Sequence, residues 1–181
     1  SPRAVVGARG RYLGPGLQSE TMRRGYTREV EDRLLRQSDW VQDGYRLFGI
    51  SVFDESSGPT WFDPPTESNS LFLSRELWTE LGGYDRRFTS VGGGMVNLDT
   101  WSRALALPGI TPIVLLGEAT FHQFPGGTMT NAADQLDRWK TLCAEYQSIR
   151  GHPWQWSTAP LRWWGTFCHT PPPGEFVCRF R

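Results

Sequence analysis

The stretch that decides the fold runs from Ser68 to Arg103 and reads SNSLFLSRELWTELGGYDRRFTSVGGGMVNLDTWSR. Leu71 to Leu73 is a short apolar run that predicts a strand. Ser74 follows it in the position of a helix cap, so a helix is expected from Arg75. The pair Gly82-Gly83 ends that helix after two turns. A strand and a short helix are therefore expected in direct succession.

A glycine loop with an acidic turn completes this stretch. Gly92, Gly93 and Gly94 allow positive φ angles and a close approach of the backbone to a ligand. The segment from Asn97 through Asp99 to Arg103 has the polar first turn of a helix entry. We expect Arg103 to pair with a carboxylate inside the fold, because a guanidinium holds a carboxylate with two hydrogen bonds.

From Asn69 the residues follow the order N-x-x-x-x-x-R-x-x-W/F-x-x-x-G-G-Y/F-D-x-x-F, then the glycine loop and the acidic turn. This order resembles the second half of the catalytic domain of the family 2 (inverting) glycosyltransferases, which have the GT-A fold. The resemblance covers roughly residues 48–131. It implies an α/β fold with a mixed sheet flanked by helices. It also implies a transferase of the hexosyltransferase class, which moves a sugar from a nucleotide-sugar donor to a hydroxyl of a glycan or other acceptor with inversion.

The acidic turn departs from the family pattern. In those enzymes it usually reads E-D-x-D-L-x-x-R, and its first Asp is the base that deprotonates the acceptor hydroxyl. Alignment on Arg103 places Asn97 at that Asp and Asp99 at the second one. The resemblance therefore makes Asn97 and Asp99 the catalytic candidates and leaves open which of them occupies the base position. From the residues alone, Asp99 can instead complement the dipole of its helix.

Downstream, TPIVLLG from Thr111 to Gly117 predicts a strand, and EATFHQFPGG follows it. A subset of family 2 sequences is similar here and combines G-G-G-hydrophobic-V-N-x-D with L-L-G-E-x-T-F-H-Q. The resemblance implies that His122 helps to hold a divalent metal (Mn²⁺ or Mg²⁺) or the donor diphosphate. The alternative is a histidine with ordinary partners at a strand end.

The family's metal also needs a D-x-D motif, and no two Asp residues of this chain are two apart. The N-terminal residues SPRAVVGARG resemble the strand that follows the nucleotide-binding half of a GT-A domain. We therefore expect the chain to be a fragment: the acceptor-side part of a metal-dependent enzyme whose N-terminal half belongs to the same polypeptide.

The polar loop from Asp54 to Ser68 and the glycine loop supply the candidate acceptor contacts. Loops on a rigid scaffold often carry binding residues. The sequence points to Trp61 and Glu67 in the first loop, to Asn69 directly after it, and to Gly93 and Gly94 in the second loop. An ordinary polar loop, and a tryptophan that packs in the core, are the alternatives.

Composition limits the other classes of function. The 181 residues fit one domain, with 1–150 as its main part and the Pro- and Trp-rich residues 151–181 packed on it. The 19 basic and 19 acidic residues balance, which argues against a nucleic-acid partner. No run approaches the roughly 18 apolar residues of a transmembrane segment. Three cysteines without a C-x-x-C pair favour a reducing compartment, so we expect a cytoplasmic protein.

The flanking elements follow from local patterns. Residues 4–9 and 45–53 predict strands, and residues 28–41 predict an amphipathic helix capped by Thr27. A helix over 131–150 is expected to turn one apolar stripe toward the core. That stripe comprises Leu136, Trp139, Cys143, Tyr146 and Ile149.

Two functions from different classes remain at this point. One is the acceptor-side portion of a glycosyltransferase. The other is a non-catalytic carbohydrate-binding or interaction domain derived from the same fold, which the missing D-x-D, Asn97 and the tryptophans favour.

Overall fold

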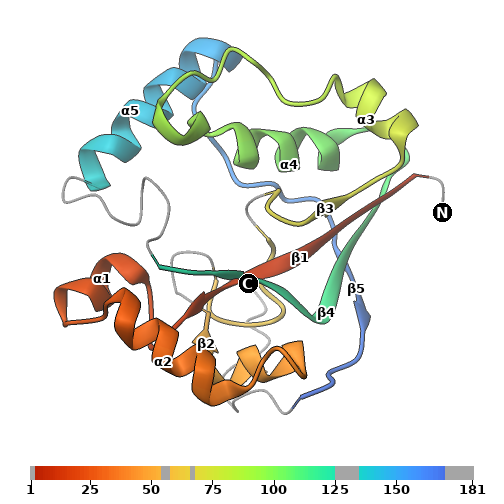
Figure 1. The fold of residues 1–181 in the computed structure, drawn as a ribbon. Coiled ribbons are helices and arrows are strands. Elements are labelled where there is room, and N and C mark those ends of the chain that lie inside the picture. Colours follow the sequence, from red (N-terminus) through yellow and green to blue (C-terminus); the bar gives the residue numbers. More distant parts are fainter. Residues whose placement is uncertain (1–2, 54–57, 66–67, 125–134, 170–181) are drawn as a thin grey trace.

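The computed structural model describes residues 3–53, 58–65, 68–124 and 135–169. One mixed, curled sheet is flanked by helices, which confirms the expected α/β class (Figure 1). On one side of the sheet lie α3 (Arg75–Leu81), α4 (Val96–Ala106) and α5 (Gln135–Arg150). On the other side lie α1 (Gln18–Arg23) and α2 (Arg28–Ser38).

The sheet is built around β1 (Ala4–Leu13), which runs parallel to β4 (Thr111–His122). The two-residue strands β2 (Ser51–Val52) and β3 (Leu71–Phe72) pair with β1 in the antiparallel sense. Burial alternates along β1: its odd-numbered residues, from Val5 to Leu13, are all buried, whereas most residues on its other face are half-buried or exposed.

A register shift allows β4 to extend beyond the strand end that the sequence predicted. Ala8 pairs with Leu115, but Arg9 pairs with Ala119, so β4 bulges between them. Gly117 lies in this bulge at φ 79° and in close contact with the carbonyl of Thr166, where no other side chain fits. Beyond the bulge β4 continues along β1 and places His122 opposite Tyr12. The sequence predicted a strand only to Gly117.

Two apolar clusters hold α3, α4 and α5 in place by packing. In the first, Val5 of β1 packs with Leu77 and Leu81 of α3 and with Trp101 of α4. The ring of Trp101 lies against Gly7, where a Cβ atom would be only 2.9 Å from it. The second cluster joins Phe88 and Met95, on either side of the glycine loop, to Leu142 and Tyr146 of α5.

The predicted starts of α2 and α3 and the predicted end of α3 are confirmed, whereas α2 ends at Ser38 instead of continuing to residue 41, because Asp39 takes the left-handed conformation (φ 53°). Ser74 Oγ accepts a hydrogen bond from Leu77 N (3.2 Å), and Thr27 Oγ1 accepts one from Val30 N (3.4 Å). Gly82 takes the left-handed conformation (φ 77°) at the end of α3. These side chains and this glycine satisfy the backbone groups that helix ends leave unpaired.

The strand predicted over 45–53 is wrong for most of its length. Gly44–Ile50 forms a 3₁₀ helix, η1, and only Ser51–Val52 pairs as a strand. Asp43 starts the helix by accepting a hydrogen bond from Tyr45 N (3.0 Å). The apolar run then buries Phe48 through helical turns instead of through alternation.

Two predictions about the C-terminal third also need correction. The stripe of α5 turns Tyr146 to the core but leaves Leu136 69% exposed, and Leu142 takes part in the core instead. In the Trp-rich segment, β5 (Arg162–Gly165) adds to β4 in parallel, a strand that the sequence did not predict. A second 3₁₀ turn, η3 (Val91–Gly93), lies in the glycine loop.

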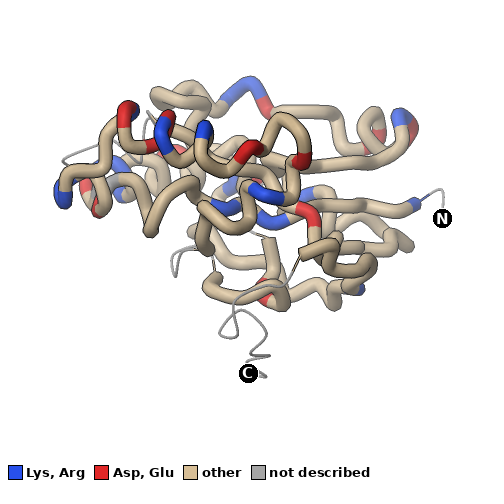
Figure 2. Tube along the Cα trace, turned by 60° about the horizontal axis from the view of Figure 1, so that its bottom comes forward, with Lys and Arg blue, Asp and Glu red and all other residues tan. Residues whose placement is uncertain are grey.

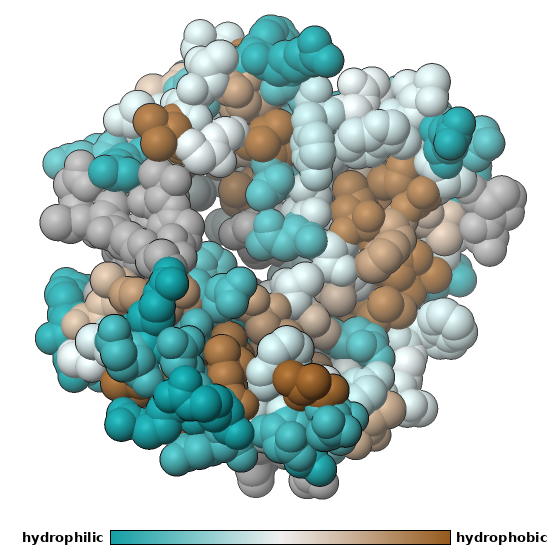
Figure 3. Space-filling view, in the orientation of Figure 1, coloured by the Kyte–Doolittle hydropathy of each residue, from teal (hydrophilic) through white to brown (hydrophobic). Residues whose placement is uncertain are grey.

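Basic and acidic positions are interspersed along the described parts of the chain trace (Figure 2). In Figure 3, apolar side chains gather on one side of the view, over the region of β3 and β4. Phe72 of β3 is 60% exposed.

Candidate functional site

Three polar residues meet where β3 begins and α4 begins. Asn97 Nδ2 donates a hydrogen bond to Asn69 Oδ1 (3.2 Å), and Ser68 Oγ donates one to Asn97 Oδ1 (3.4 Å). We call Ser68, Asn69 and Asn97 the amide cluster. Asn69 is exposed, Asn97 is half-buried and Ser68 is buried. The structure thus brings together two of the residues that the sequence assigned to an acceptor site, and it adds Ser68.

Local structure fixes the two sides of this cluster. Ser68 and Asn69 enter β3, whose pairing of Leu71 with Gly7 ties them to the central strand. Asn97 lies in the first turn of α4, which Trp101 anchors on Gly7. Both sides therefore rest on the same point of β1, and the cluster is held by the packing of the core.

Asp99 lies on the opposite side of α4 from Asn97, because residues two apart on a helix point away from each other. It is 1% exposed. Arg150 Nε donates to Asp99 Oδ1 (2.7 Å), while Arg150 Nη2 and Arg103 Nε both donate to Oδ2 (2.7 Å each). The predicted pairing of Arg103 with a carboxylate is confirmed.

These three hydrogen bonds occupy both oxygens of Asp99, and burial keeps a substrate hydroxyl away from them. The geometry favours a structural role for Asp99. Of the two candidates that the sequence left open, only Asn97 lies where an acceptor can reach it in this arrangement. The base role of Asp99 stays a prediction.

The same arginine extends the network to the turn after α3. Arg150 Nη2 lies 2.9 Å from Asp85 Oδ2. Asp85 also accepts from the backbone N of Arg87 (3.0 Å) and pairs with its guanidinium. The hydrogen bond from Arg87, with the charges of Arg150 and Arg87, lowers the pKa of Asp85 despite partial desolvation. Asp85 therefore fixes the turn that leads into the glycine loop.

The glycine loop is held from behind by α5. Glu145 Oε1 accepts hydrogen bonds from Thr89 N and Ser90 N, at 2.8 Å each. Its Oε2 is buried against Gly94, with no hydrogen-bond partner among the described residues. Gly94 (φ 58°) leaves no room for a side chain there, and Gly93 (φ 85°) has Val96 beside it. Both predicted contact glycines therefore shape the loop, and their binding role stays a prediction.

His122 lies at the end of β4, half-buried against the ring of Tyr12. Gln18 of α1, fully buried, donates through Nε2 to the His122 carbonyl (3.3 Å) and contacts Nδ1 through Oε1 (3.2 Å). In this pairing Nδ1 carries the proton, so a neutral ring presents a lone pair at Nε2, the form that binds a metal or accepts a hydrogen bond.

The residues that follow His122 are held by hydrogen bonds to α2. The backbone N of Phe124 donates to both oxygens of Glu31, at 2.8 and 3.0 Å, and Tyr26 Oη donates to Glu31 Oε2 (3.0 Å). Desolvation raises the pKa of this buried carboxyl, which the Phe124 and Tyr26 hydrogen bonds partly offset. No signal in the sequence singled out Gln18 or Glu31, because each acts through distant contacts.

Trp61 is fully buried among Phe48, Phe53 and Phe167. The structure gives it the packing role, since no face of its indole is open to a sugar. Glu67 lies outside the described residues, and its binding role stays a prediction.

Two buried arginines of β1 organise the loop before the amide cluster. Arg9 is 1% exposed, and its guanidinium donates to the carbonyls of Asp63 and Pro64 (2.8 Å each) and to that of Gly58. Burial lowers the pKa of Arg9 to about 10, against the opposing charge of Asp63. Arg11 donates to Ser51 and lies over the Phe53 ring at 4.3 Å.

A small cavity adjoins this loop and α4. Its volume is about 60 Å³, and its lining includes Pro64, Pro65, Trp101, Ser102, Trp154 and Trp156. We call it the Trp156 cavity. The sequence flagged the tryptophan-rich segment but interpreted it as packing.

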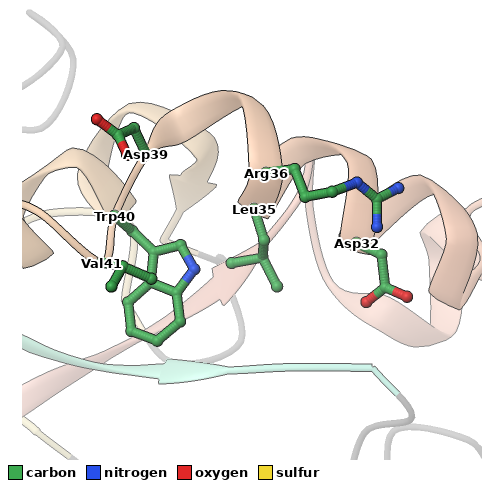
Figure 4. A pocket seen from close by; sticks show the side chains of 6 residues that line it. All are labelled: Asp32, Leu35, Arg36, Asp39, Trp40 and Val41. Carbon is green, nitrogen blue, oxygen red and sulfur yellow. The ribbon is translucent and has the colours of Figure 1, made fainter.

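A more open hollow lies at the end of α2, with a volume of about 270 Å³ (Figure 4). Asp32, Leu35 and Trp40 project into it from the helix and the turn after it. None of the residues predicted from the sequence as site residues lines it.

The described residues contain no group of three or more His, Cys, Asp or Glu side chains that could hold a metal ion. His122 is therefore a single candidate ligand there. Among the same residues, no helix is both long and apolar enough to cross a membrane.

Comparison with models of protein families, with curated proteins and with solved structures gives no significant match.

Proposed function

We propose that this chain is the acceptor-side portion of an inverting glycosyltransferase, with the amide cluster as the place where the acceptor hydroxyl is held. The observation that carries the proposal is the hydrogen bond between Asn69 and Asn97, 3.2 Å long. The resemblance made Asn97 a catalytic candidate, and its position before the strand made Asn69 a candidate acceptor contact. The two meet although 28 positions separate them in the chain.

Each part of the cluster suits a sugar hydroxyl. An amide offers a donor and an acceptor on one planar group, and a hydroxyl does both through one oxygen. An acceptor hydroxyl needs one group that accepts its hydrogen and one that donates to its oxygen. Asn97, Asn69 and Ser68 can therefore orient one hydroxyl from several directions. Such positioning lowers the barrier, because the reacting atoms no longer have to find their geometry.

In the proposed reaction the acceptor oxygen attacks the anomeric carbon of the donor sugar. The new C–O bond forms as the bond to the diphosphate breaks, and the hydroxyl proton passes to a base. The amide cluster contains no carboxylate, so its role is to orient the hydroxyl. We place the base outside this cluster.

The described residues bring together no set of metal ligands, so we derive no step through a metal ion. His122, with its proton held at Nδ1 by Gln18, can accept a hydrogen bond or contribute one ligand through Nε2. We propose that it acts on the donor side.

The proposal is tested with Asn69→Ala, Asn97→Ala and the double variant in acceptor-dependent transfer. Each single change is expected to raise the acceptor KM or lower kcat/KM about tenfold or more, the cost of about 1.4 kcal/mol or more of hydrogen bonding. Because the two amides act as one unit, the double variant should lose less than the product of the two factors. Gln147→Ala on the exposed side of α5 is the control. Unchanged kinetics in both single variants would refute the assignment.

A non-catalytic carbohydrate-binding domain is the second candidate. The cluster without a carboxylate and the exposed Trp156 favour it. It predicts glycan binding with no transfer from any nucleotide sugar.

A further inference from the structure

The Trp156 cavity begins one helical turn from the amide cluster. Asn97, Trp101 and Leu105 follow one another at four-residue spacing on α4, so they lie on one face of the helix. Four residues advance roughly 6 Å along the axis. Trp101 and Leu105 line the cavity, and the loop that brings Pro64 and Pro65 to it leads on to Ser68. The cavity thus continues the proposed acceptor site.

Its walls are uncharged. The residues that line it are apolar, aromatic or hydroxyl-bearing, and none carries a formal charge. A phosphate, a carboxylate or an ammonium group would lose its hydration there without a partner. The occupant is therefore neutral, which separates this cavity from any donor diphosphate site.

Its aromatic rings offer flat apolar faces. Trp156 is 53% exposed and stands edge-to-face with Trp154, whose ring centre is 5.6 Å away. About half of the Trp156 side chain is therefore accessible to a ligand. The C–H face of a pyranose ring fits such an indole, because both surfaces are flat and weakly polar.

Hydrogen-bonding groups lie at the margin of the cavity. Ser102 and Ser157 line it, and Ser157 Oγ accepts from Ala159 N (3.3 Å), which directs its own hydrogen elsewhere. Trp154 Nε1 is buried without a hydrogen-bond partner among the described residues.

The volume of about 60 Å³ exceeds the space that one water needs and admits part of a single ring. A proline-rich peptide also packs well against aromatic side chains, but its backbone offers mainly carbonyl acceptors. The adjoining amide cluster presents acceptor oxygens as well as donors, and a sugar hydroxyl matches both through one oxygen.

We infer that the Trp156 cavity binds one neutral hexopyranose ring of the acceptor, with Trp156 against its apolar face. The inference rests on the proposed function in assigning that ring to the acceptor, but the binding itself needs neither transfer nor donor. Trp156 is then a binding residue that selects a glycosidic acceptor over a simple alcohol.

The test measures saturation transfer in NMR from the whole chain to methyl glycosides of glucose, galactose and mannose, with EDTA present. We expect at least one to bind, Trp156→Ala to weaken it about tenfold or more, and Trp156→Phe to retain most of it. Trp164→Ala is the matched control, since Trp164 is 71% exposed on β5 and does not line the cavity. Circular dichroism confirms that each variant is folded.

No binding by any of the three glycosides, or equal binding by Trp156→Ala, overturns the inference. A decaproline peptide that binds through Trp156 where the glycosides do not would assign the cavity to a peptide and also overturn it. If the glycosides bind as expected but no sugar transfer occurs, the proposed function fails and the carbohydrate site stands. If transfer occurs with the acceptor KM unchanged in Trp156→Ala, the inference alone fails.

Discussion

Asn97 and Asp99 are two residues apart on α4, and the helix turns them to opposite sides. Asn97 meets Asn69, while Asp99 lies buried beneath Arg150 and Arg103. The resemblance made both residues catalytic candidates, because they align with the two Asp residues of the family's acidic turn. The structure separates them because side chains two apart on a helix do not share a face.

Asp99→Asn tests the structural role. The change removes a buried negative charge that two half-buried guanidinium groups contact, so the free energy of unfolding should fall by about 3 kcal/mol. Urea denaturation followed by circular dichroism measures it. Asp137→Asn, which breaks an exposed pair with Lys140, should leave the midpoint unchanged. A fully stable but inactive Asp99→Asn protein would instead support the base role.

Among the elements, the glycine loop depends on contacts from α5. Gly94 faces the carboxylate of Glu145, which also holds the backbone of Thr89 and Ser90. A side chain at this position would therefore act on the whole loop.

Gly94→Ala should destabilise the protein more than Gly82→Ala. Both glycines have positive φ, for which alanine costs about 1–2 kcal/mol, but no atom lies within 4 Å of a Cβ at Gly82. At Gly94 the added methyl displaces Glu145, which adds about 1–3 kcal/mol for the backbone groups left unpaired. Thermal unfolding of the two variants measures the difference. Equal losses would show that the loop does not depend on Glu145.

The turn after α3 makes stability sensitive to acid. The hydrogen bond from Arg87 and the nearby charges lower the pKa of Asp85 below its unfolded value near 3.9. The native state then binds fewer protons than the unfolded chain, so this stabilisation is complete above the unfolded pKa. It is lost as the pH falls through the native pKa.

Asp85→Asn should therefore lower the free energy of unfolding at pH 7 and flatten its decline below about pH 4. Chemical denaturation from pH 2 to 7 measures both. Asp32→Asn, at an exposed position on α2, is the comparison. Parallel curves for wild type and Asp85→Asn would contradict the assignment.

Features of the molecule that depend on neighbouring residues could be predicted from the sequence. The caps at Ser74 and Thr27 and the stop at Gly82 each follow from contacts within a few positions. The remaining features of the fold depend on pairing between strands that are far apart in the chain. The bulge that extends β4 to His122 and the addition of β5 depend on β1 and on the C-terminal segment, so no local pattern reveals them.

The candidate site shows the same division. Asn69 and Asn97 were identified from a motif, but their contact, and the contribution of Ser68, required the packing of α4 on β1. The Trp156 cavity combines a loop, a helix and the C-terminal segment. Its members are scattered from Pro64 to Leu161, and their apolar character is typical of a core as well as of a sugar site.

At the scale of the whole molecule, one sheet positions the three proposed binding features, which are the amide cluster, the Trp156 cavity and His122. β1 links them, because Asn69 enters the strand that pairs at Gly7 and His122 pairs with Tyr12. Five positions of β1 therefore span the proposed acceptor and donor sides, roughly 16 Å along the strand.

The most direct measurement is sugar transfer itself. The chain, together with any residues that precede Ser1 in the natural protein, is incubated with Mn²⁺ and radiolabelled UDP-glucose, UDP-galactose, UDP-N-acetylglucosamine or GDP-mannose. Methyl glycosides and oligosaccharides serve as acceptors, and NMR reports the configuration of the product. We predict transfer from one donor with inversion at the anomeric carbon, and loss of at least tenfold in kcat/KM in Asn97→Ala. The proposed function would be contradicted by a folded protein that transfers no sugar from any of these donors. It would also be contradicted if Asn97→Ala left the rate of transfer unchanged.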